Sequence, residues 1–396
     1  MRAPRALAAL CLAALAAASL GAADFGILSE GQGRWTSGAA EPFSGAGRLT
    51  FWASLGAGTR LRGFASLSAF ADSATEAAGP SGYLDIGILR LDADLGQSLG
   101  AAADIVLSVG RFDFGDPSGY VLAHRADGMA LRLAAPGVVV SAQAAWLGLQ
   151  PKASSRVFMT SADVADYLDT SVEYAPARGV GIFSVRFPEI LARQDATIFV
   201  AGQTDLRAET AKRFDSYYGG LSLRGALGDG LYWNGFGVGE YSAKGIGLLA
   251  GGSVEYLGSG PTARLDLVAA TGSNGPLSTY IPVSSTILGE ASRATASNIA
   301  MLALNGGWKL SGSLKPSLRA AAYLRASPDP LALAGFDATS RDPYVGAELS
   351  GSLAMRTLSD FGLSASASLF MPNSGGSFVA GTPPKTRVSL DAGISL

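Results

Sequence analysis

Apolar and polar residues alternate along the chain from about residue 48 to its last residue. In the segment 386–396, Val388, Leu390 and Ile394 alternate with polar or small residues such as Ser389 and Asp391. Successive side chains of a β-strand point to opposite faces, so each such segment has one apolar face and one polar face. The pattern therefore predicts an all-β protein.

Seventeen segments carry this alternation clearly enough to be assigned as strands. Most of them reach the 9–11 residues that a tilted strand needs to cross a bilayer. They are expected at 48–56, 60–71, 82–94, 102–114, 127–134, 137–149, 180–187, 194–205, 213–227, 230–242, 246–257, 262–272, 297–310, 314–326, 342–357, 360–371 and 386–396.

The connections between these segments alternate in length. Short turns such as 57–59, 135–137 and 311–313 are followed by long polar connections. The long loops are expected at 72–81, 115–126, 150–179, 206–212, 273–296, 327–341 and 372–385. Short turns at one rim and long loops at the other are typical of outer-membrane barrels.

The alternation of short turns and long loops also fixes the number of strands. A short turn follows the strand at 48–56, so another strand must precede it, and we expect one with a weak pattern within 25–37. The total becomes eighteen, an even number, or sixteen if the region 180–205 is assigned wrongly. The expected fold is a transmembrane antiparallel up-and-down β-barrel, wide enough to leave an aqueous lumen.

The N-terminal segment and the composition agree with an exported membrane protein. Residues 1–23 read as a signal peptide, with Arg2 and Arg5 before an apolar core and Gly21-Ala22-Ala23 as the cleavage site, which leaves 24–396 as the barrel. The chain is 48% hydrophobic and 16% charged, yet no later run of 18 apolar residues predicts a membrane helix. With 30 basic and 32 acidic residues, nothing suggests a nucleic-acid partner.

If the apolar face of each strand meets lipid, the other face lines the lumen. An arginine facing lipid at mid-bilayer costs about 2–4 kcal/mol, so charged strand residues are expected to point inward. The expected pore-lining residues are Arg62, Arg90, Arg132, Arg186, Arg224, Arg264, Asp266, Arg319, Arg325, Glu348 and Arg356. Such a wall either attracts anions or is only hydrated and paired with its acidic residues, and both interpretations stay open.

The longest loop, 150–179, is the expected constriction. A short helix is predicted at 161–169, and its acidic residues Asp163, Asp166 and Asp169 are the candidate constriction residues. The loop either folds into the lumen or lies on the outer surface. Aromatic residues near strand ends, such as Trp52, fit an interfacial girdle, with a sugar-stacking track inside the pore as the alternative.

Enzyme and metal sites are not supported. Gly96-Gln97-Ser98-Leu99-Gly100 matches the nucleophile string G-x-S-x-G, but it lies in a turn between strands. His124, the only histidine, lies in a loop at the opposite rim, and Cys11, the only cysteine, lies in the signal peptide. We therefore expect no catalytic residues, no metal and no cofactor.

Two stretches resemble a known family. The segment Val109-Gly110-Arg111-Phe112-Asp113-Phe114-Gly115, followed by Asp127-Gly128-Met129-Ala130-Leu131-Arg132-Leu133, resembles a hairpin of alginate-export-like and related bacterial porins. The segments 342–371 and 386–396 resemble their closing hairpin and assembly signal, although the last residue is Leu396 instead of an aromatic residue. The resemblance implies an eighteen-stranded barrel whose arginine-lined pore passes anionic or sugar-like solutes.

The expected function is passive passage of small hydrophilic solutes across the bacterial outer membrane. The expected partners are outer-membrane lipid, those solutes, and the barrel assembly machinery through 386–396. A structural or adhesive barrel with an occluded lumen and partner-binding loops is the alternative. A soluble exported β-sandwich is the third possibility that the strand pattern allows.

Overall fold

The computed structural model describes residues 23–395, except 38–42, 58–60, 73–80, 97–102, 153, 158, 170, 192, 332 and 357–359. The expected signal peptide, apart from Ala23, and Leu396 lie outside the described residues. The signal peptide therefore stays a prediction.

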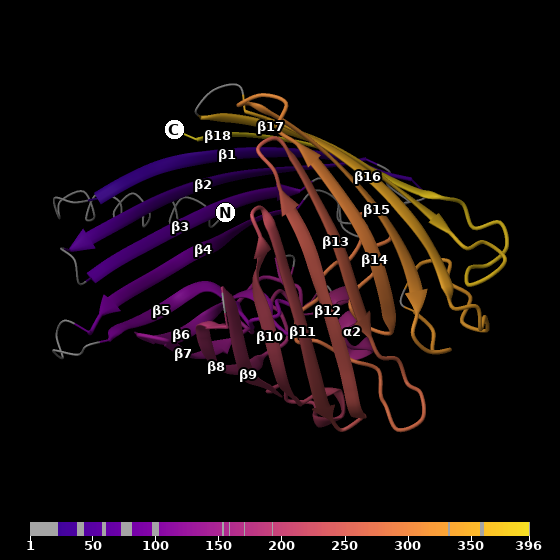
Figure 1. Ribbon diagram of the computed structural model, residues 1–396, viewed down its shortest axis with the longest axis horizontal. Coiled ribbons are helices and arrows are strands. Elements are labelled where there is room, and N and C mark those ends of the chain that lie inside the picture. Colours follow the sequence, from indigo (N-terminus) through magenta and orange to yellow (C-terminus); the bar gives the residue numbers. More distant parts are fainter. Residues whose placement is uncertain are drawn as a thin grey trace.

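The described residues form eighteen strands, one short α-helix and one 3-10 turn (Figure 1). The strands are β1 (Ala23–Thr36), β2 (Phe43–Ala57), β3 (Leu61–Asp72), β4 (Ser81–Asp94), β5 (Asp104–Gly115), β6 (Ala123–Ala135), β7 (Val138–Trp146), β8 (Arg178–Leu191), β9 (Gln194–Asp205), β10 (Ser216–Gly228), β11 (Leu231–Ser242), β12 (Gly245–Leu257), β13 (Pro261–Ala270), β14 (Ile299–Trp308), β15 (Leu314–Arg325), β16 (Tyr344–Arg356), β17 (Phe361–Pro372) and β18 (Lys385–Ser395). The helix is α2 (Ser161–Leu168), and the 3-10 turn is η1 (Thr210–Lys212).

The sheet closes on itself. Each strand pairs antiparallel with its neighbours in the sequence, and β1 pairs with β18 from Leu28↔Ser395 to Thr36↔Arg387. Closure matters because the bilayer core holds no water that could bond to free backbone groups, and a closed barrel leaves no edge. The expected eighteen-stranded barrel is confirmed, and the sixteen-stranded alternative is wrong.

Strand boundaries differ from the expectation where the sequence shows no apolar alternation. β2 begins at Phe43 instead of 48, because Ser44-Gly45-Ala46-Gly47 carries no apolar alternation but still pairs with β1 through Gly45↔Gly33. β6 begins at Ala123 instead of 127, because the start of the strand pairs with the end of β5. Backbone pairing extends both strands beyond their amphipathic pattern.

The two faces of the wall differ as the alternation predicts. Large apolar side chains on the outer face are between 43% and 58% exposed, among them Leu131, Leu265, Leu304, Leu318, Leu349 and Leu390. Their neighbours Arg319 and Tyr323 point to the other face, where the Tyr323 hydroxyl donates to the Leu288 carbonyl of a loop inside the barrel, at 3.1 Å.

Aromatic residues occupy both faces. Trp146, Tyr217, Tyr241, Trp308 and Tyr344 are between 39% and 63% exposed, as expected for an interfacial girdle. Trp52, Phe64, Phe70 and Tyr83 share the inner face of β2–β4, where Trp52 stacks on Phe64 and Phe70 on Tyr83. The girdle interpretation therefore fits only part of the set.

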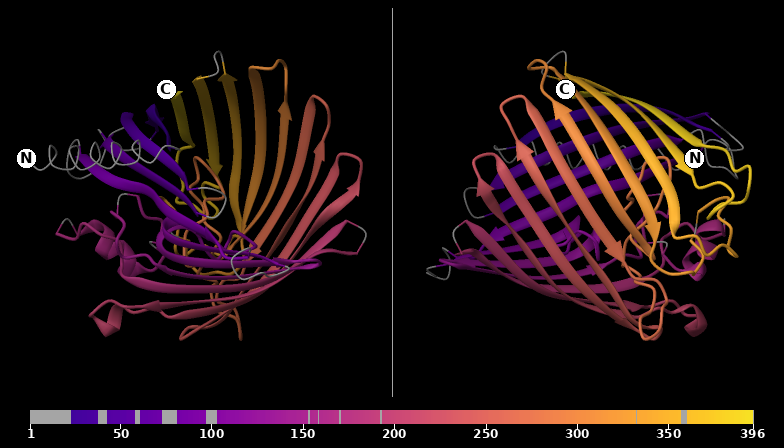
Figure 2. Two further views of the ribbon diagram at one scale, coloured as in Figure 1. Left: turned by 90° about the vertical axis from the view of Figure 1, so that its left-hand side faces the viewer. Right: turned by 45° about the vertical axis from the view of Figure 1, so that its right-hand side comes forward.

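Connections that follow odd-numbered strands lie at one rim, the loop rim, and most of them are long. Those that follow even-numbered strands lie at the other rim, the short-turn rim. Several loops at the loop rim fold inward, as Figure 2 shows, and their apolar residues, including Val121, Tyr280 and Val283, are fully buried. These residues pack in one cluster with inward residues of the wall such as Phe199 and Met301. The apolar core thus lies between the barrel wall and the loops that fold into the barrel.

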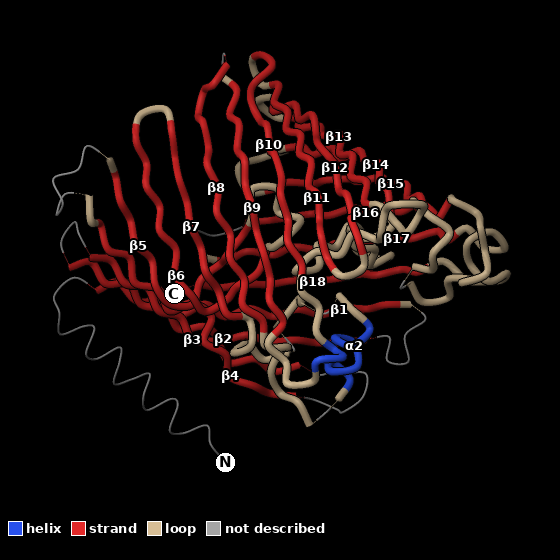
Figure 3. The backbone as a smooth tube through the Cα atoms, turned by 90° about the horizontal axis from the view of Figure 1, so that it is seen from below, coloured by secondary structure: helices blue, strands red, loops and turns tan. Residues whose placement is uncertain are grey.

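None of the described helices is long and apolar enough to cross a membrane. α2 lies among the loops at one end of the strands (Figure 3).

The outward face of β15 allows a direct test of membrane insertion. Leu318→Arg places a charge on the outer face, and Ser317→Arg places the same charge on the inner face of the same strand. In lipid vesicles, Leu318→Arg should lower the free energy of unfolding by about 2–4 kcal/mol, while Ser317→Arg should change it much less. Equal losses, measured by urea unfolding, would contradict the assignment of the faces.

Candidate constriction and charged inner wall

The connection between β13 and β14, residues 271–298, crosses the barrel, and we call it the crossing loop. Its Val283 and Ser284 amides both donate to the Val121 carbonyl, at 2.9 and 3.2 Å, in the loop between β5 and β6. The two loops start eight positions apart in a ring of eighteen strands, so they come from nearly opposite walls. The two loops therefore span the interior between them, and the loop between β5 and β6 itself reaches β11, where Tyr120 stacks on Phe236 at 5.0 Å.

Hydrogen bonds to Asp116 hold the loop between β5 and β6 in the conformation that the crossing loop contacts. Asp116 accepts hydrogen bonds from the backbone amides of Ser118, Val121 and Leu122, at 2.8 to 2.9 Å. A carboxylate that binds several amides closes a short loop into one conformation. The Val121 carbonyl is thereby fixed in the position where the crossing loop binds.

Two buried glutamates of the wall hold the crossing loop. Glu240 of β11 accepts a hydrogen bond from the Ile281 amide at 2.5 Å. Glu348 of β16 accepts bonds from the amides of Glu290 and Ser292, at 2.7 and 3.0 Å. Both glutamates are at most 2% exposed, so their carboxyl groups bind the loop and do not face solvent.

Arginines of the wall bind carbonyls of the same loop. The Arg319 guanidinium donates to the Leu288 carbonyl at 2.7 Å, and that of Arg387 donates to the Glu290 carbonyl at 3.3 Å. The crossing loop is therefore held at β11, β15, β16 and β18 as well as by the loop between β5 and β6.

Part of the predicted constriction loop, 150–179, also reaches the crossing loop. The Ser285 amide donates to the Arg156 carbonyl at 2.9 Å, and the Arg156 amide donates to His124 Nε2, also at 2.9 Å. The sequence favours 150–179 as the constriction, whereas the structure adds a second loop that passes from wall to wall.

The predicted constriction acids lie elsewhere in that loop. Asp163 is fully buried, binds Arg178 at 2.5 Å and Arg207 at 3.0 Å, and forms a capping box with Thr160 at the start of α2. The predicted helix is confirmed. Asp166 binds Arg207 at 3.0 Å, while Asp169 is exposed, and hydrogen bonds from Ser171 lower its pKa.

These ion pairs attach α2 to the start of β8 and to the loop between β9 and β10. Burial disfavours the charge of Arg207, but its hydrogen bonds to Asp205 and Asp166 outweigh burial and raise its pKa. Removing one member of such a buried network leaves an uncompensated charge, so the network is a rigid attachment for the loop.

Four predicted pore-lining arginines pair with acids of the wall. The pairs are Arg90–Asp92 at 2.7 Å, Arg186–Asp195 at 2.5 Å, Arg224–Asp195 at 3.3 Å and Arg264–Asp266 at 2.7 Å. Arg62 and Arg132 are exposed. Arg325 is 5% exposed and donates to the carbonyls of Pro328, Ser340 and Asp342, so it holds the loop between β15 and β16.

Further arginines gather at the crossing loop, and the alternation of the strands does not identify them. Burial lowers the pKa of Arg293, Glu290 opposes that effect, and the nearby charges of Arg34 and Arg156 lower it further. Arg156 and Arg293 lie in loops, where no alternation assigns a face. Arg34 lies in β1, the strand with the weakest pattern.

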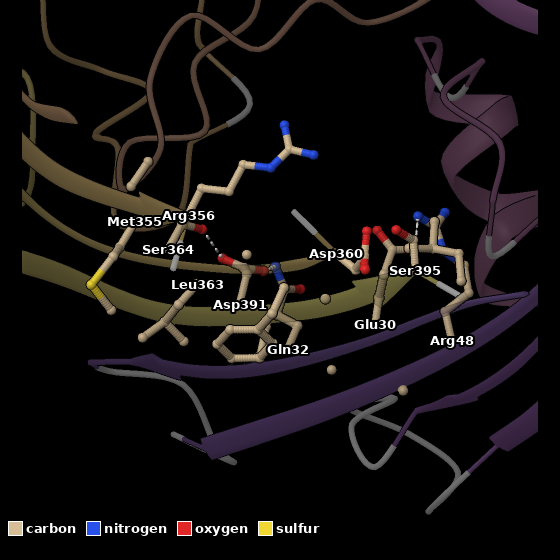
Figure 4. A pocket seen from close by; sticks show the side chains of 18 of the residues that line it. Glu30, Gln32, Arg48, Met355, Arg356, Asp360, Leu363, Ser364, Asp391 and Ser395 are labelled. Atoms are coloured by element: carbon tan, nitrogen blue, oxygen red, sulfur yellow. Dashed lines mark hydrogen bonds and ion pairs between the residues drawn. The ribbon is translucent and has the colours of Figure 1, made fainter. Parts of the chain in front are cut away.

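A cavity of about 780 Å³ lies against the wall formed by β1, β2 and β15–β18 (Figure 4). Its lining carries both charges: Glu30 pairs with Arg48, Gln32 donates to Asp391 at 2.5 Å, and Arg356 extends into the open space. The cavity has room for a small solute together with its hydration water.

No cluster of three metal-binding side chains occurs among the described residues. His124 lies at the loop-rim end of β6, whereas Gly96 follows β4 at the short-turn rim. Gly96, the described residue of the G-x-S-x-G match, is therefore at the opposite rim from the histidine.

Solved structures of outer-membrane barrels resemble the chain over nearly its whole length. OccK5 of Pseudomonas aeruginosa has a TM-score of 0.63 at 13% identity, covering 95% of this chain and 98% of that chain. The outer membrane protein OpdK of the same species has a TM-score of 0.59 at 11% identity, covering 94% and 99%. OccAB3 of Acinetobacter baumannii has a TM-score of 0.57 at 11% identity, covering 94% and 100%.

At these identities the likeness establishes the fold, which is that of the eighteen-stranded bacterial outer-membrane porins. No protein-family model matches the chain, and no curated protein matches it.

The anchor at Glu348 can be tested without any functional assay. Glu348→Ala removes the acceptor for the amides of 290–292, so hydrogen exchange in 287–296 should become about tenfold faster or more. Glu255→Ala, on the inner face of β12, is the control and should leave that segment protected. Unchanged exchange in Glu348→Ala, measured by mass spectrometry on the folded barrel, would show that the anchor is dispensable.

Proposed function

We propose that the protein is a channel of the bacterial outer membrane through which small hydrophilic solutes pass by diffusion. The crossing loop is the observation that supports this most. An eighteen-stranded barrel is too wide for wall side chains to fill, and a loop anchored at several points narrows it to a defined passage. The exposed leucines of the outer face favour a lipid surround.

We further propose a preference for anions. The proposed lining is formed by the residues expected from the sequence: Arg62, Arg90, Arg132, Arg186, Arg224, Arg264, Asp266, Arg319, Arg325, Glu348 and Arg356. The acids of this set weaken the field only in part, because Glu348 is bound by loop amides, while Arg62 and Arg132 are exposed. Fixed positive charge in a confined passage raises the local concentration of anions.

We also propose that the protein is related to the alginate-export-like porins. This proposal rests on the hairpin 109–133, which β5 and β6 form, and it suggests anionic or sugar-like solutes. Insertion by the barrel assembly machinery through 386–396 is proposed on the same ground. The lack of a histidine near Gly96 supports a protein without catalytic activity.

A structural or adhesive barrel is the second candidate. The crossing loop buries Tyr280 and Val283 completely, and such packing also suits an occluded interior whose outer loops bind a partner. Absence of conductance from folded protein would favour this candidate.

Ion selectivity tests the proposed function. In a planar bilayer under a salt gradient, the wild-type protein should conduct, and its reversal potential should indicate anion preference. Replacing Arg132, Arg264 and Arg319 by Ala should shift that potential toward cations, because Asp266 then loses its partner Arg264.

The control removes the same number of charges from turns and loops: Lys244, Lys309 and Arg341 replaced by Ala. It should retain the anion preference. Cation preference of the wild type, unchanged in the triple arginine variant, would refute the anion proposal while leaving the channel itself intact.

A further inference from the structure

Strands β4 and β5 pair over only part of their lengths. Their ladder runs from Leu89↔Arg111 to Asp94↔Val106, six pairs and fewer than any other neighbouring strands of the described barrel have. Residues 81–88 continue along β3, and residues 112–115 continue along β6. The two strands separate toward the loop rim, as Figure 1 shows, and we call the region between these segments the parting.

Two glycines stand where the strands diverge. Gly110 has φ +123°, and a Cβ on it would lie 1.9 Å from the Leu89 carbonyl oxygen. Its partner across the ladder, Gly128, has no room either, since a Cβ there would lie 2.0 Å from the Ala144 carbonyl oxygen. The backbone turns away from β4 at a position that only glycine tolerates.

An open strand edge inside a membrane is costly, because its backbone groups have no water to bond. Arg111 occupies this position. Its guanidinium donates to Asp85 and to the Ile86 carbonyl on the free edge of β4, at 3.0 and 3.2 Å, and to Asp127 of β6 at 2.7 and 2.8 Å. One side chain thus bridges β4 and β5 beyond the point where their backbone ladder ends.

Arg111 also contacts the loop between β7 and β8. The last donor of Arg111 binds the Leu149 carbonyl at 3.2 Å. We call residues 149–152 and 154–157 the strap. Because Arg156 of the strap accepts the Ser285 amide, the strap links the parting to the crossing loop.

Apolar groups border the parting on both sides of the wall. Leu84, Ile86 and Leu89 are 43% to 54% exposed on the outer face. On the inner face, Phe70 stacks on Tyr83 at 4.8 Å and Phe112 on Phe114 at 4.2 Å.

Cationic groups lie directly over these inner rings. The Arg48 guanidinium is 5.7 Å from the ring of Phe70, and that of Arg90 is 5.1 Å from the ring of Phe112. The lumen side of the parting thus combines aromatic surface with two guanidinium groups, which also pair with Glu30 and Asp92. On the outer side, the β4 border of the parting is apolar.

We propose that the parting is a lateral opening in the barrel wall, closed by Arg111 and the strap, through which an anionic amphiphile with an acyl chain passes between the lumen and the bilayer. The aromatic rings accept the chain, and Arg48 and Arg90 meet the carboxylate. This route does not depend on axial conductance, so either can exist without the other.

Photoaffinity labelling tests the lateral route. Dodecanoate that carries a diazirine at the end of its chain is added to the full-length protein in lipid vesicles, and labelled peptides are identified by mass spectrometry. In the wild type, label should concentrate in 81–89 and 109–115, and unlabelled dodecanoate should compete with it.

Arg111→Ala should raise this labelling about tenfold, since a buried ion pair that joins two strands is lost. Arg186→Ala removes a wall arginine paired with an aspartate on β9 and should leave the labelling at the parting unchanged. Only barrels that stay folded, judged by their heat-dependent mobility in gels, are compared.

Label spread evenly over the outward residues of all strands would overturn the proposal, because it would report ordinary contact with lipid. Label confined to the crossing loop and the cavity would overturn it too, because it would show an axial route only. The wild-type result decides this even if Arg111→Ala does not fold.

Discussion

A backbone N–H or C=O group without a partner in hydrocarbon costs several kcal/mol, and this cost governs the whole molecule. The ladder between β1 and β18 removes the two edges that an open sheet of eighteen strands would expose. Where the ladder between β4 and β5 stops, Arg111 replaces backbone pairing with side-chain donors. The closed wall and the side-chain bridge made by Arg111 both satisfy this one constraint.

A wall of this circumference is hollow, so the loops decide what the interior does. The crossing loop is held by buried carboxylates, Glu240 and Glu348, which bind its amides, and by arginines that bind its carbonyls. Because these partners come from separate strands, the loop cannot shift at one anchor without straining the others. The charges of Arg34 and Arg156 lie near Arg293 of the crossing loop, together with the opposite charge of Glu290.

Most of the fold could be predicted from the sequence, because a lipid-facing surface forces strict alternation along each strand. The outward Leu265 and Leu318 and the inward Arg319 follow from that rule alone. Helix α2 was likewise predictable, since the capping residues Thr160 and Asp163 act locally. Glycine-rich starts such as that of β2 were not, because pairing with a neighbour replaces the amphipathic signal there.

The site was less predictable, because long-range contacts build it. The contact between Val283 and Val121 joins residues more than 160 positions apart, and no local pattern reveals it. The sequence places Arg325 and Glu348 on the inner face of their strands. It does not reveal that both side chains also bind loops, because those contacts are long-range too. Arg156 and Arg293 lie in loops, so their place beside the narrow passage had no signal in the sequence.

Swelling of liposomes in sugars of graded size tests most directly whether a loop-narrowed aqueous passage exists. The wild-type protein should admit small sugars and exclude large ones, whereas a variant with residues 281–290 replaced by a short glycine-serine linker should admit larger sugars at higher rates. If neither protein supports swelling, or if both show the same size limit, the account of a barrel narrowed by its crossing loop is wrong.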